Sequence, residues 1–327
     1  MAAKVTETLP TAALSSDRIA RLRGGLRQWF ARNARDLPWR RTRDPYAILV
    51  SEVMLQQTQV DRVLPYYEQF LQRFPTAHAL AAAPTAEVIR IWSGLGYNRR
   101  AVNLQRAAKA VVELYGGVFP SYPAILKTLP GIGAYTAGAV AAFAFERDVA
   151  FLDTNMRRVV NRVVFGAEPA PESQVLEAAH ALLPPGEGWA WNQALIEFGA
   201  LQCTARRPAC VVCPLQAECA AFPMVQTMLV AKSKAPRSAT TAPFQQTTRY
   251  FRGRIVEALR ELPEHDESGI DLTQLGSRVR EGFSEVDVPW LRGLVDGLQR
   301  DGLAVVAEDS PEYDADPTVT RTRVRLP

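Results

Sequence analysis

The 327-residue sequence lacks any long run of apolar residues, although apolar residues make up 47% of it. The longest apolar stretch, Ala137–Phe145, contains a glycine and is far shorter than the roughly 20 residues that a membrane span needs. A basic segment followed by an apolar one is also missing near Met1, so we expect no signal peptide. The composition favours a globular protein of two or three domains, which we expect in the cytoplasm, associated with the nucleoid.

Lysine is scarce in a sequence that is mildly basic overall. The net charge is +4 and the pI is near 8.9, which is compatible with nucleic-acid binding but does not establish it. Only five of the 38 basic residues are lysines: Lys4, Lys109, Lys127, Lys232 and Lys234. The arginine excess is also what GC-rich coding would produce. Because an enzyme that uses an amine nucleophile needs a lysine at its site, the scarcity limits that chemistry.

Strand-like alternation is missing from the first two-thirds of the chain. After a polar lead-in over residues 1–16, apolar residues recur at three- and four-residue spacing up to about residue 222. The expected helical stretches are Ile19–Phe30, Tyr46–Gln57, Val60–Arg73, Ala86–Ser93, Ala101–Leu114, Ala134–Phe145, Asn155–Val164, Pro171–Leu183 and Trp191–Leu201. The sequence therefore predicts an all-α domain over residues 17–222.

The last hundred residues differ from this pattern. Residues 223–247 include a small, polar, proline-broken segment and are expected to form a linker. Residues 248–327 contain three helical patterns, followed by two alternating segments, Leu303–Glu308 and Val319–Leu326. Three helices and a terminal hairpin predict a small α+β module that resembles a winged helix. Such modules bind DNA or form dimer and protein contacts, and the sequence leaves both roles open.

Cysteine is absent except in one short cluster. Cys203, Cys210, Cys213 and Cys219 have the spacing C-x6-C-x2-C-x5-C. A cytoplasmic chain with every cysteine in one loop favours a metal site over disulfides. Thiolates at this spacing can hold either Zn²⁺ or an iron–sulfur cubane, although structural zinc sites usually pair two short knuckles.

A glycine turn begins the helix expected after residue 133. The segment Leu129-Pro-Gly-Ile-Gly-Ala-Tyr-Thr136 has two glycines, which let the backbone approach a phosphate without an obstructing Cβ. The helix that follows would present unpaired N–H groups and the positive end of its dipole. The turn predicts a grip on the DNA backbone, but many purely structural turns have the same form.

Two carboxylates stand in settings that suggest chemistry. Asp153 precedes an expected helix and can cap its N-terminus. Glu52 lies in a strongly apolar helix, where a glutamate is costly unless it is paired, exposed or functional. An exposed position at the helix edge is the simplest explanation of Glu52 from the sequence alone.

Taken together, these motifs resemble the helix-hairpin-helix DNA glycosylases of the endonuclease III and MutY family, over roughly residues 17–222. The segment Pro45–Gln59 is most similar to MutY-type adenine glycosylases. The cysteine spacing matches the 4Fe–4S loop of that family, so the resemblance implies a structural cluster. Arg206 and Arg207 in the loop can face DNA phosphates. The implied partner is double-stranded DNA with a mispaired or damaged base, and the implied substrate is adenine opposite 8-oxoguanine or guanine.

The resemblance also implies catalytic roles. Glu52 would be the general acid for adenine N7, because burial among apolar residues raises the pKa of a carboxyl and keeps its proton. Asp153 would stabilise positive charge at C1′ as the glycosidic bond breaks. Asn155 would orient Asp153 or the attacking water. Bifunctional relatives carry a lysine in the hairpin helix, where this sequence has Tyr135, so we expect a monofunctional enzyme without efficient lyase activity.

DNA-contacting residues follow from the same resemblance. Gln56 and Gln57 would insert into the duplex, although a solvated helix end explains them equally simply. Tyr97, in Gly94-Leu-Gly-Tyr97, would wedge beside the opposing guanine unless it is only a packed tyrosine. The hairpin residues expected to hold a phosphate are Gly131, Gly133 and Thr136. A monomer can engage one lesion by itself, so we expect a monomer that hands its product to downstream repair proteins.

The sequence departs from the MutY pattern in three places. Thr154 replaces a glycine beside Asp153, and Asn98 replaces a second tyrosine after Tyr97. Residues 248–327 are too short for the Nudix-like domain that usually checks for 8-oxoguanine, so we expect weaker discrimination between 8-oxoguanine and guanine. Two alternatives stay open: a glycosylase for thymine or uracil opposite guanine, and a non-catalytic iron–sulfur DNA-binding protein.

Overall fold

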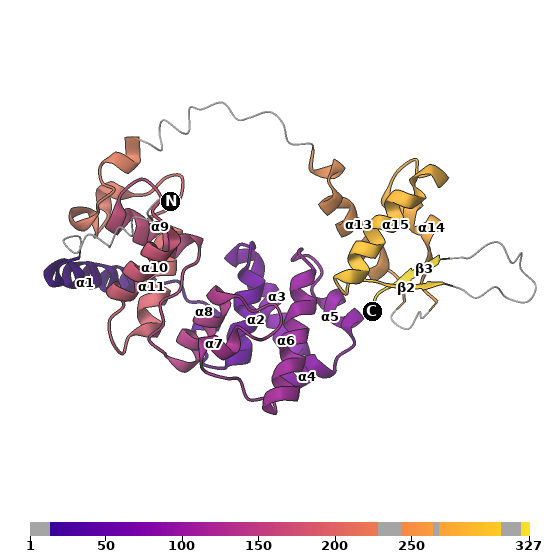
Figure 1. The fold of residues 1–327 in the computed structure, drawn as a ribbon, viewed down its shortest axis with the longest axis horizontal. Coiled ribbons are helices and arrows are strands. Elements are labelled where there is room, and N and C mark those ends of the chain that lie inside the picture. The colour runs from indigo at the N-terminus through magenta and orange to yellow at the C-terminus, as the bar shows by residue number, and fades with distance from the viewer. Residues whose placement is uncertain (1–13, 228–242, 264–267, 309–321) are drawn as a thin grey trace, which may run out of the picture. The chain divides into compact units, whose positions relative to one another are not determined.

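The computed structural model describes residues 14–227, 243–263, 268–308 and 322–327 (Figure 1). The predicted all-α architecture of the first two-thirds is confirmed. Its described helices are α1 (Ser16–Asn33), α2 (Pro45–Leu55), α3 (Val60–Arg73), α4 (Ala77–Ala82), α5 (Thr85–Ile91), α6 (Arg99–Tyr115), α7 (Pro123–Leu126), α8 (Ala134–Phe145), α9 (Thr154–Val160), α10 (Glu172–Leu182) and α11 (Gly188–Leu201). Among the described helices, none is long and apolar enough to cross a membrane.

The chain divides into two compact units that interleave along the sequence. The first unit comprises Met1–Ile48, Ser121–Lys127 and Ile132–Ser238; the second comprises Leu49–Pro120, Thr128–Gly131 and Ala239–Pro327. The second unit thus joins the helices α3 to α6 with the C-terminal module. The expected linker lies largely within residues 228–242, outside the described part, and the expected domain boundaries stay predictions.

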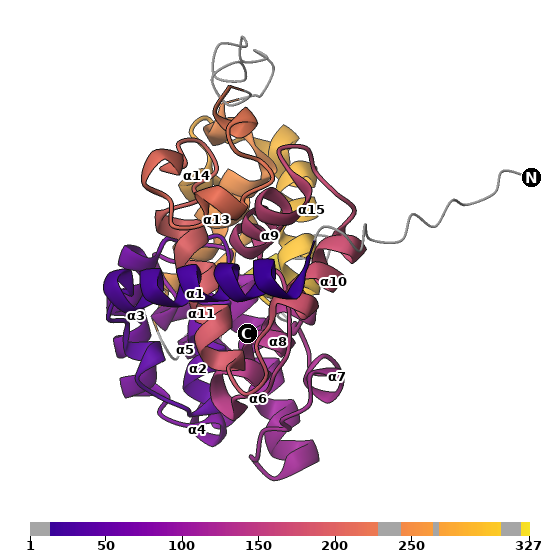
Figure 2. The ribbon, with the colours of Figure 1, turned by 90° about the vertical axis from the view of Figure 1, so that its left-hand side faces the viewer.

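The core of the first unit is built on α11, which packs against α1, α8 and α9 (Figure 2). The ring of Trp29 on α1 meets that of Phe198 on α11 edge-on, with centroids 4.9 Å apart. Helix α8 consists mainly of small and apolar residues and is buried from Thr136 to Phe143. Gly138 is required there, because a Cβ at this position would lie 2.7 Å from the Cβ of Phe151.

A buried carboxylate crosslinks the first unit. Glu197 on α11 is fully buried, with its side chain 0% exposed. Its Oε1 accepts hydrogen bonds from the backbone N and Nε of Arg35, both at 2.9 Å, and Oε2 accepts from Arg40 Nη2 at 2.9 Å. Burial alone would raise the pKa of Glu197, but the bonds from Arg35 and Arg40 bring it down to about 2. The carboxylate is therefore a structural charge at neutral pH.

In the second unit, α6 packs against α4 and α5. An aromatic cluster anchors the arrangement: the ring of Phe70 meets Phe74 and Trp92 edge-on, at centroid distances of 5.1 and 5.8 Å. The three rings are fully buried. This cluster holds the turn after α5, which carries the Gly94–Tyr97 segment.

The C-terminal module has the predicted α+β form. Its elements are β1 (Ile270–Asp271), β2 (Val305–Glu308), β3 (Thr322–Arg325), α13 (Thr248–Arg260), α14 (Leu272–Val279) and α15 (Val288–Arg300). The antiparallel sheet has the order β1-β3-β2, with Val306 opposite Val324. The two-residue strand β1 was not predicted. Apolar residues of α13, α14 and α15 form a core that also includes Ile89 of α5 and Val102 of α6.

Candidate active site and nucleic-acid interface

The fold requires glycine at only one of the two glycine positions of the hairpin turn. Gly131 has a φ of +75°, and a Cβ there would lie 2.6 Å from the Cβ of Asn103, so the fold itself requires glycine. Gly133 caps α8 in an ordinary extended conformation, and a Cβ there would meet nothing within 4 Å. Both glycines are exposed. The protein's own packing therefore does not explain Gly133, and the space beside it is open to a ligand.

The next residues of this segment are partly withdrawn from solvent. Thr136 is buried. The ring of Tyr135 is half-buried and meets Phe151 edge-on, with centroids 5.5 Å apart. The contact with Phe151 therefore fixes the ring of Tyr135.

Asp153 caps α9, as its sequence position predicts. Its Oδ1 accepts a hydrogen bond from the backbone N of Met156 at 2.6 Å. Burial raises the pKa of Asp153, and bonds to Met156 and Asn155, together with the charge of Arg158, partly counteract the rise. The carboxyl is thus held in a fixed orientation and partly shielded from water.

Arg158 is a site residue that sequence reasoning missed. Its Nη2 donates to Asn155 Oδ1 at 2.7 Å and to the Gly199 carbonyl at 2.6 Å, while its Nε donates to the Cys203 carbonyl at 2.8 Å. The same side chain therefore connects Asn155, beside Asp153, to the start of the cysteine loop. Burial lowers the pKa of Arg158. Thr154, between Asp153 and Asn155, is exposed.

The cysteine loop is bonded to the segment that follows α9. Arg162, which is buried, donates from Nη1 to Cys203 Sγ at 3.5 Å and to the Thr204 carbonyl at 2.8 Å. The thiol of Cys219 donates to the Arg162 carbonyl at 3.5 Å. The loop therefore has a defined place against the segment that continues α9, the helix capped by Asp153.

The four cysteines are chemically suited to a cation. Burial, aided by the nearby thiols, raises the pKa of Cys213 to about 11 against the lowering effect of a backbone hydrogen bond at Leu215. Burial and the neighbouring thiols also raise the pKa of Cys210. A bound cation would reverse this by stabilising the thiolates. In the described residues, no three His, Cys, Asp or Glu side chains are already gathered for metal binding. The donor chemistry thus fits a metal group, although the side chains are not in a ready coordination shell.

Glu52 lies in the second unit, on α2, and is buried, with 5% of its surface exposed. The explanation by an exposed helix edge is therefore wrong. Its neighbours Val50, Val53 and Met54 are also buried. A carboxyl buried in an apolar helix is costly unless it is bonded or has a function.

Arg100 organises the loops at the end of α2 and was not recognised in the sequence. It is 9% exposed, and burial lowers its pKa to about 10. Its two terminal nitrogens donate to six acceptors at 2.6–3.2 Å: the carbonyls of Val53, Met54, Gln56, Leu95 and Gly96, and the hydroxyl of Thr58. The guanidinium thereby joins the end of the Glu52 helix to the loop that carries Tyr97.

Both loops carry a residue in the left-handed backbone region. Gln57 has a φ of +58° and Tyr97 a φ of +46°, which is unusual for side chains of this size. Tyr97 is 37% exposed, so it is not simply a packed core tyrosine. Gln57 is exposed and Gln56 half-buried. Strained residues of this kind concentrate at functional sites.

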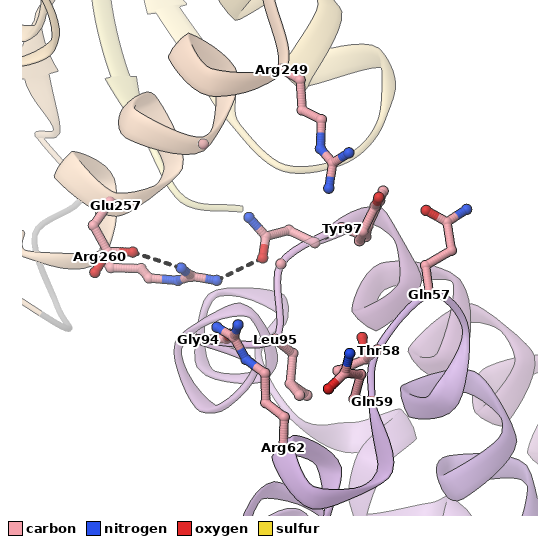
Figure 3. Close-up of a pocket in the computed structure, with 13 residues that line it drawn as sticks. Gln57, Thr58, Gln59, Arg62, Gly94, Leu95, Tyr97, Arg249, Glu257 and Arg260 are labelled. Atoms are coloured by element: carbon pink, nitrogen blue, oxygen red, sulfur yellow. Dashed lines mark hydrogen bonds and ion pairs between the residues drawn. The ribbon is translucent and has the colours of Figure 1, made fainter. Parts of the chain in front are cut away.

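Gln57 and Tyr97 line one pocket of about 680 Å³ in the second unit (Figure 3). Its other lining residues include Arg62, Arg249 and Arg260. The structure thus brings Gln57 and Tyr97 together with basic side chains, within the unit that holds Glu52. The first unit holds Asp153, Asn155, Tyr135 and the cysteines.

Comparisons with known proteins identify relatives among base excision DNA repair proteins. Residues 50–185 match the family described as HhH-GPD superfamily base excision DNA repair protein. The adenine DNA glycosylase of Mycolicibacterium smegmatis is 43% identical over 297 residues, which is 87% of this chain and 92% of that protein. The human adenine DNA glycosylase is 42% identical over 221 residues, which is 64% of this chain and 40% of the human protein.

A solved structure of a thermostable thymine-DNA glycosylase shares the fold. It is 30% identical with a TM-score of 0.60, and the match covers 64% of this chain and 98% of that one. The helical fold and the similarity over nearly the whole length of the mycobacterial relative support the same assignment. The chain belongs to the adenine DNA glycosylase family, within the helix-hairpin-helix superfamily of base excision repair proteins.

Proposed function

We propose that this protein is a monofunctional DNA glycosylase that hydrolyses the N-glycosidic bond of adenine mispaired with 8-oxoguanine or guanine, as a step of base excision repair. The burial of Glu52 among apolar residues of α2 carries the proposal, since it suits a proton donor to a base. The similarity to named adenine DNA glycosylases supports adenine as that base.

The reaction needs the adenosine outside the duplex, where a mismatch lowers the cost of flipping it. Glu52 donates its proton to adenine N7, and the electron pair of the C1′–N9 bond leaves with the base. Asp153 then stabilises the positive charge at C1′, and water adds there with loss of a proton. Asn155 orients Asp153, in keeping with the bonds between the two residues.

DNA contacts in this proposal come from both units. The backbone at Gly131 and Gly133, at the start of α8 near Thr136, binds a phosphate, and the open space at Gly133 supports this. Gln56, Gln57 and Tyr97 enter the duplex around the flipped adenine. Tyr135 offers no amine, so the product is an abasic site without strand cleavage.

We further propose that Cys203, Cys210, Cys213 and Cys219 hold a 4Fe–4S cluster. Such a cluster would order the loop and present Arg206 and Arg207, both exposed, to DNA phosphates. The bonds of Arg158 and Arg162 to this loop give it a route to brace the Asp153 helix. The protein would act as a monomer on double-stranded DNA and pass its product to downstream repair proteins.

A panel of duplexes tests the proposal. Purified protein is given A·8-oxoguanine, A·G, T·G and U·G pairs, and base release is measured with Glu52→Gln as the matched variant. Release of adenine by the native protein and its loss in the variant are expected, by about 10²–10⁴-fold for a general acid. Adenine release that does not depend on Glu52 would contradict the assignment of the acid.

A second candidate is a glycosylase for thymine or uracil opposite guanine. The 30% identity to a thymine-DNA glycosylase favours it, as does Thr154 in place of the glycine beside Asp153. The same panel separates the two, because release from T·G or U·G without release from A·8-oxoguanine would establish the alternative. Strand cleavage after base release would contradict the monofunctional assignment.

A further inference from the structure

The C-terminal module is bonded to α5 at several points within the second unit. The carbonyl of Pro327 accepts from the backbone N of Ala86 at 2.9 Å, which caps the first turn of α5. Arg90 Nη2 donates to the Leu262 carbonyl, just beyond α13, at 2.8 Å. Because Ile89 and Val102 also belong to the core of the module, its position on α5 and α6 is fixed by apolar packing as well.

Arg260 at the end of α13 holds the Tyr97 loop at its neighbour Asn98. Its Nη2 donates to Asn98 Oδ1 at 2.9 Å, its Nη1 to Glu257 at 2.8 Å, and its Nε to the Ile89 carbonyl at 3.1 Å. Dashed lines in Figure 3 mark the first two bonds. The short amide at position 98 thus has a local explanation in this chain, since it accepts a bond from the module.

Arg249, in the first turn of α13, stacks on Tyr97 itself. Its guanidinium carbon lies 3.9 Å from the centroid of the Tyr97 ring (Figure 3). Arg249 is exposed, and within the described part of the chain it makes no hydrogen bond or ion pair. A stacked guanidinium uses only its face, so its N–H groups stay available at the edge for acceptors outside the protein.

The surroundings favour an acceptor-rich, negatively charged ligand. Arg62 and Arg249 line the pocket together with the ion pair of Arg260 and Glu257. The pocket therefore carries an excess of positive charge beside an exposed aromatic ring. Nucleic acid offers both features that this pair can bind, namely bases that stack and atoms that accept hydrogen bonds.

We propose that Arg249 of the C-terminal module is a DNA contact that acts together with Tyr97. Its guanidinium holds the tyrosine ring and donates a hydrogen bond to an acceptor on the strand opposite the adenine. This inference rests on the proposed function, since it places the duplex at Tyr97. It gives the module a direct part in reading the DNA. The acceptor is a phosphate oxygen or the edge of the opposing base.

Binding measurements test this without base release. Dissociation constants of the full chain are measured for duplexes that carry a non-hydrolysable adenosine analogue opposite 8-oxoguanine or guanine. We expect Arg249→Ala to weaken binding by about tenfold. Arg278→Ala, at another exposed arginine of the module on α14, is the matched control and should change little. Because both positions are exposed, neither variant should alter the thermal unfolding of the protein.

The acceptor is identified by comparing the loss of DNA affinity between duplexes with 8-oxoguanine and with guanine opposite the adenosine analogue. A uniform loss for both opposite bases, with a salt slope reduced by about 1, identifies a phosphate. A loss confined to one opposite base identifies the base edge. Equal binding by Arg249→Ala and Arg278→Ala would overturn the proposal.

A double-mutant cycle tests whether the Arg249 and Tyr97 side chains act together. If Arg249 and Tyr97 act together, Arg249→Ala and Tyr97→Ala should lose less in combination than the sum of their separate losses. Additive losses would overturn the coupling. A native protein that binds these duplexes but releases no adenine from cleavable ones would contradict the proposed function alone, because the effect of Arg249 on binding is measured separately.

Discussion

Two buried charged side chains, Glu197 in the first unit and Arg100 in the second, are stabilised in different ways. In the first unit, the fully buried carboxylate of Glu197 is surrounded by the guanidinium groups of Arg35 and Arg40. In the second unit, the buried guanidinium of Arg100 has neutral acceptors, five backbone carbonyls and a hydroxyl. The charge of Glu197 is compensated by opposite charges, whereas the charge of Arg100 is stabilised by the dipoles of its neutral acceptors.

This difference bears on the shape of the site. An ion pair needs only that helices bring two side chains together, whereas carbonyls converge on Arg100 only when both loops have one particular conformation. Those loops contain the left-handed residues Gln57 and Tyr97. The charge of Glu197 therefore stabilises the packing of the first unit, whereas the charge of Arg100 defines the surface of the second unit that is proposed to read DNA.

The largest effect should come from Glu197→Ala. Removing this carboxylate leaves Arg35 and Arg40 without their buried partner, and breaking such a pair costs about 3–5 kcal/mol. Urea unfolding followed by circular dichroism measures the loss. Arg41→Ala, which breaks only the exposed pair with Asp36, is the control and should cost less than about 1 kcal/mol.

The same variant changes the response to acid. Because the folded pKa of Glu197 lies near 2, below its ordinary value of 4.5, its stabilisation is present above pH 4.5 and is lost as the pH falls towards 2. The slope of unfolding free energy against pH in this range should be shallower in Glu197→Ala. An unchanged slope would show that the carboxylate does not carry the linkage.

Asp153→Asn should give the next largest effect, now on chemistry alone. Asparagine is as good an N-cap as aspartate, so α9 and the unfolding free energy should be nearly unchanged. The lost negative charge should lower the single-turnover rate of adenine release by about 10²–10³-fold. Binding of an uncleaved duplex should survive. If Asp153→Asn instead lowered the unfolding free energy and left the rate of adenine release unchanged, Asp153 would be a purely structural carboxylate, as Glu197 is.

The sequence predicted the helices well because their apolar periodicity is local. The nine helical stretches expected before residue 202 all correspond to helices in the structure, and the three-helix module with its hairpin is confirmed. The short helices α4 and α7 and the two-residue strand β1 were missed. Elements of this size contain too few residues to show a period, and β1 depends on pairing with a strand about fifty residues away.

Site residues were predicted only where a motif surrounds them. Arg100, Arg158, Arg162 and Glu197 were missed because each is defined by partners distant in sequence. Glu197 did leave one signal: it is the single charged residue of its helix, as Glu52 is of α2. Arginines at helix starts and ends are ordinary on a surface, so nothing local distinguished Arg100 from Arg99.

Replacement of Arg100 by lysine tests the role assigned to the second unit. An ammonium keeps the charge but cannot span six acceptors as the planar guanidinium does. We expect a loss of about 1.5–3 kcal/mol in unfolding free energy and faster amide exchange across residues 94–98. Arg99→Lys is the matched control. Arg99 is exposed, and its Nε forms an ion pair with Asp301 Oδ1 at 3.5 Å. Equal effects of the two substitutions would remove the contrast between the units.

The smallest effects should separate the two glycines of the hairpin. Gly131→Ser places a side chain at a φ of +75° and against Asn103, so it should destabilise the fold by about 1–3 kcal/mol. Gly133→Ser meets no atom within 4 Å and supplies a favoured N-cap to α8, so stability should be kept or slightly raised. Its hydroxymethyl group nevertheless occupies the space where a phosphate would approach, and affinity for DNA should fall. The unfolding free energy and the DNA affinity of both variants are measured. Undiminished DNA affinity in Gly133→Ser would mean that the hairpin is only a structural turn.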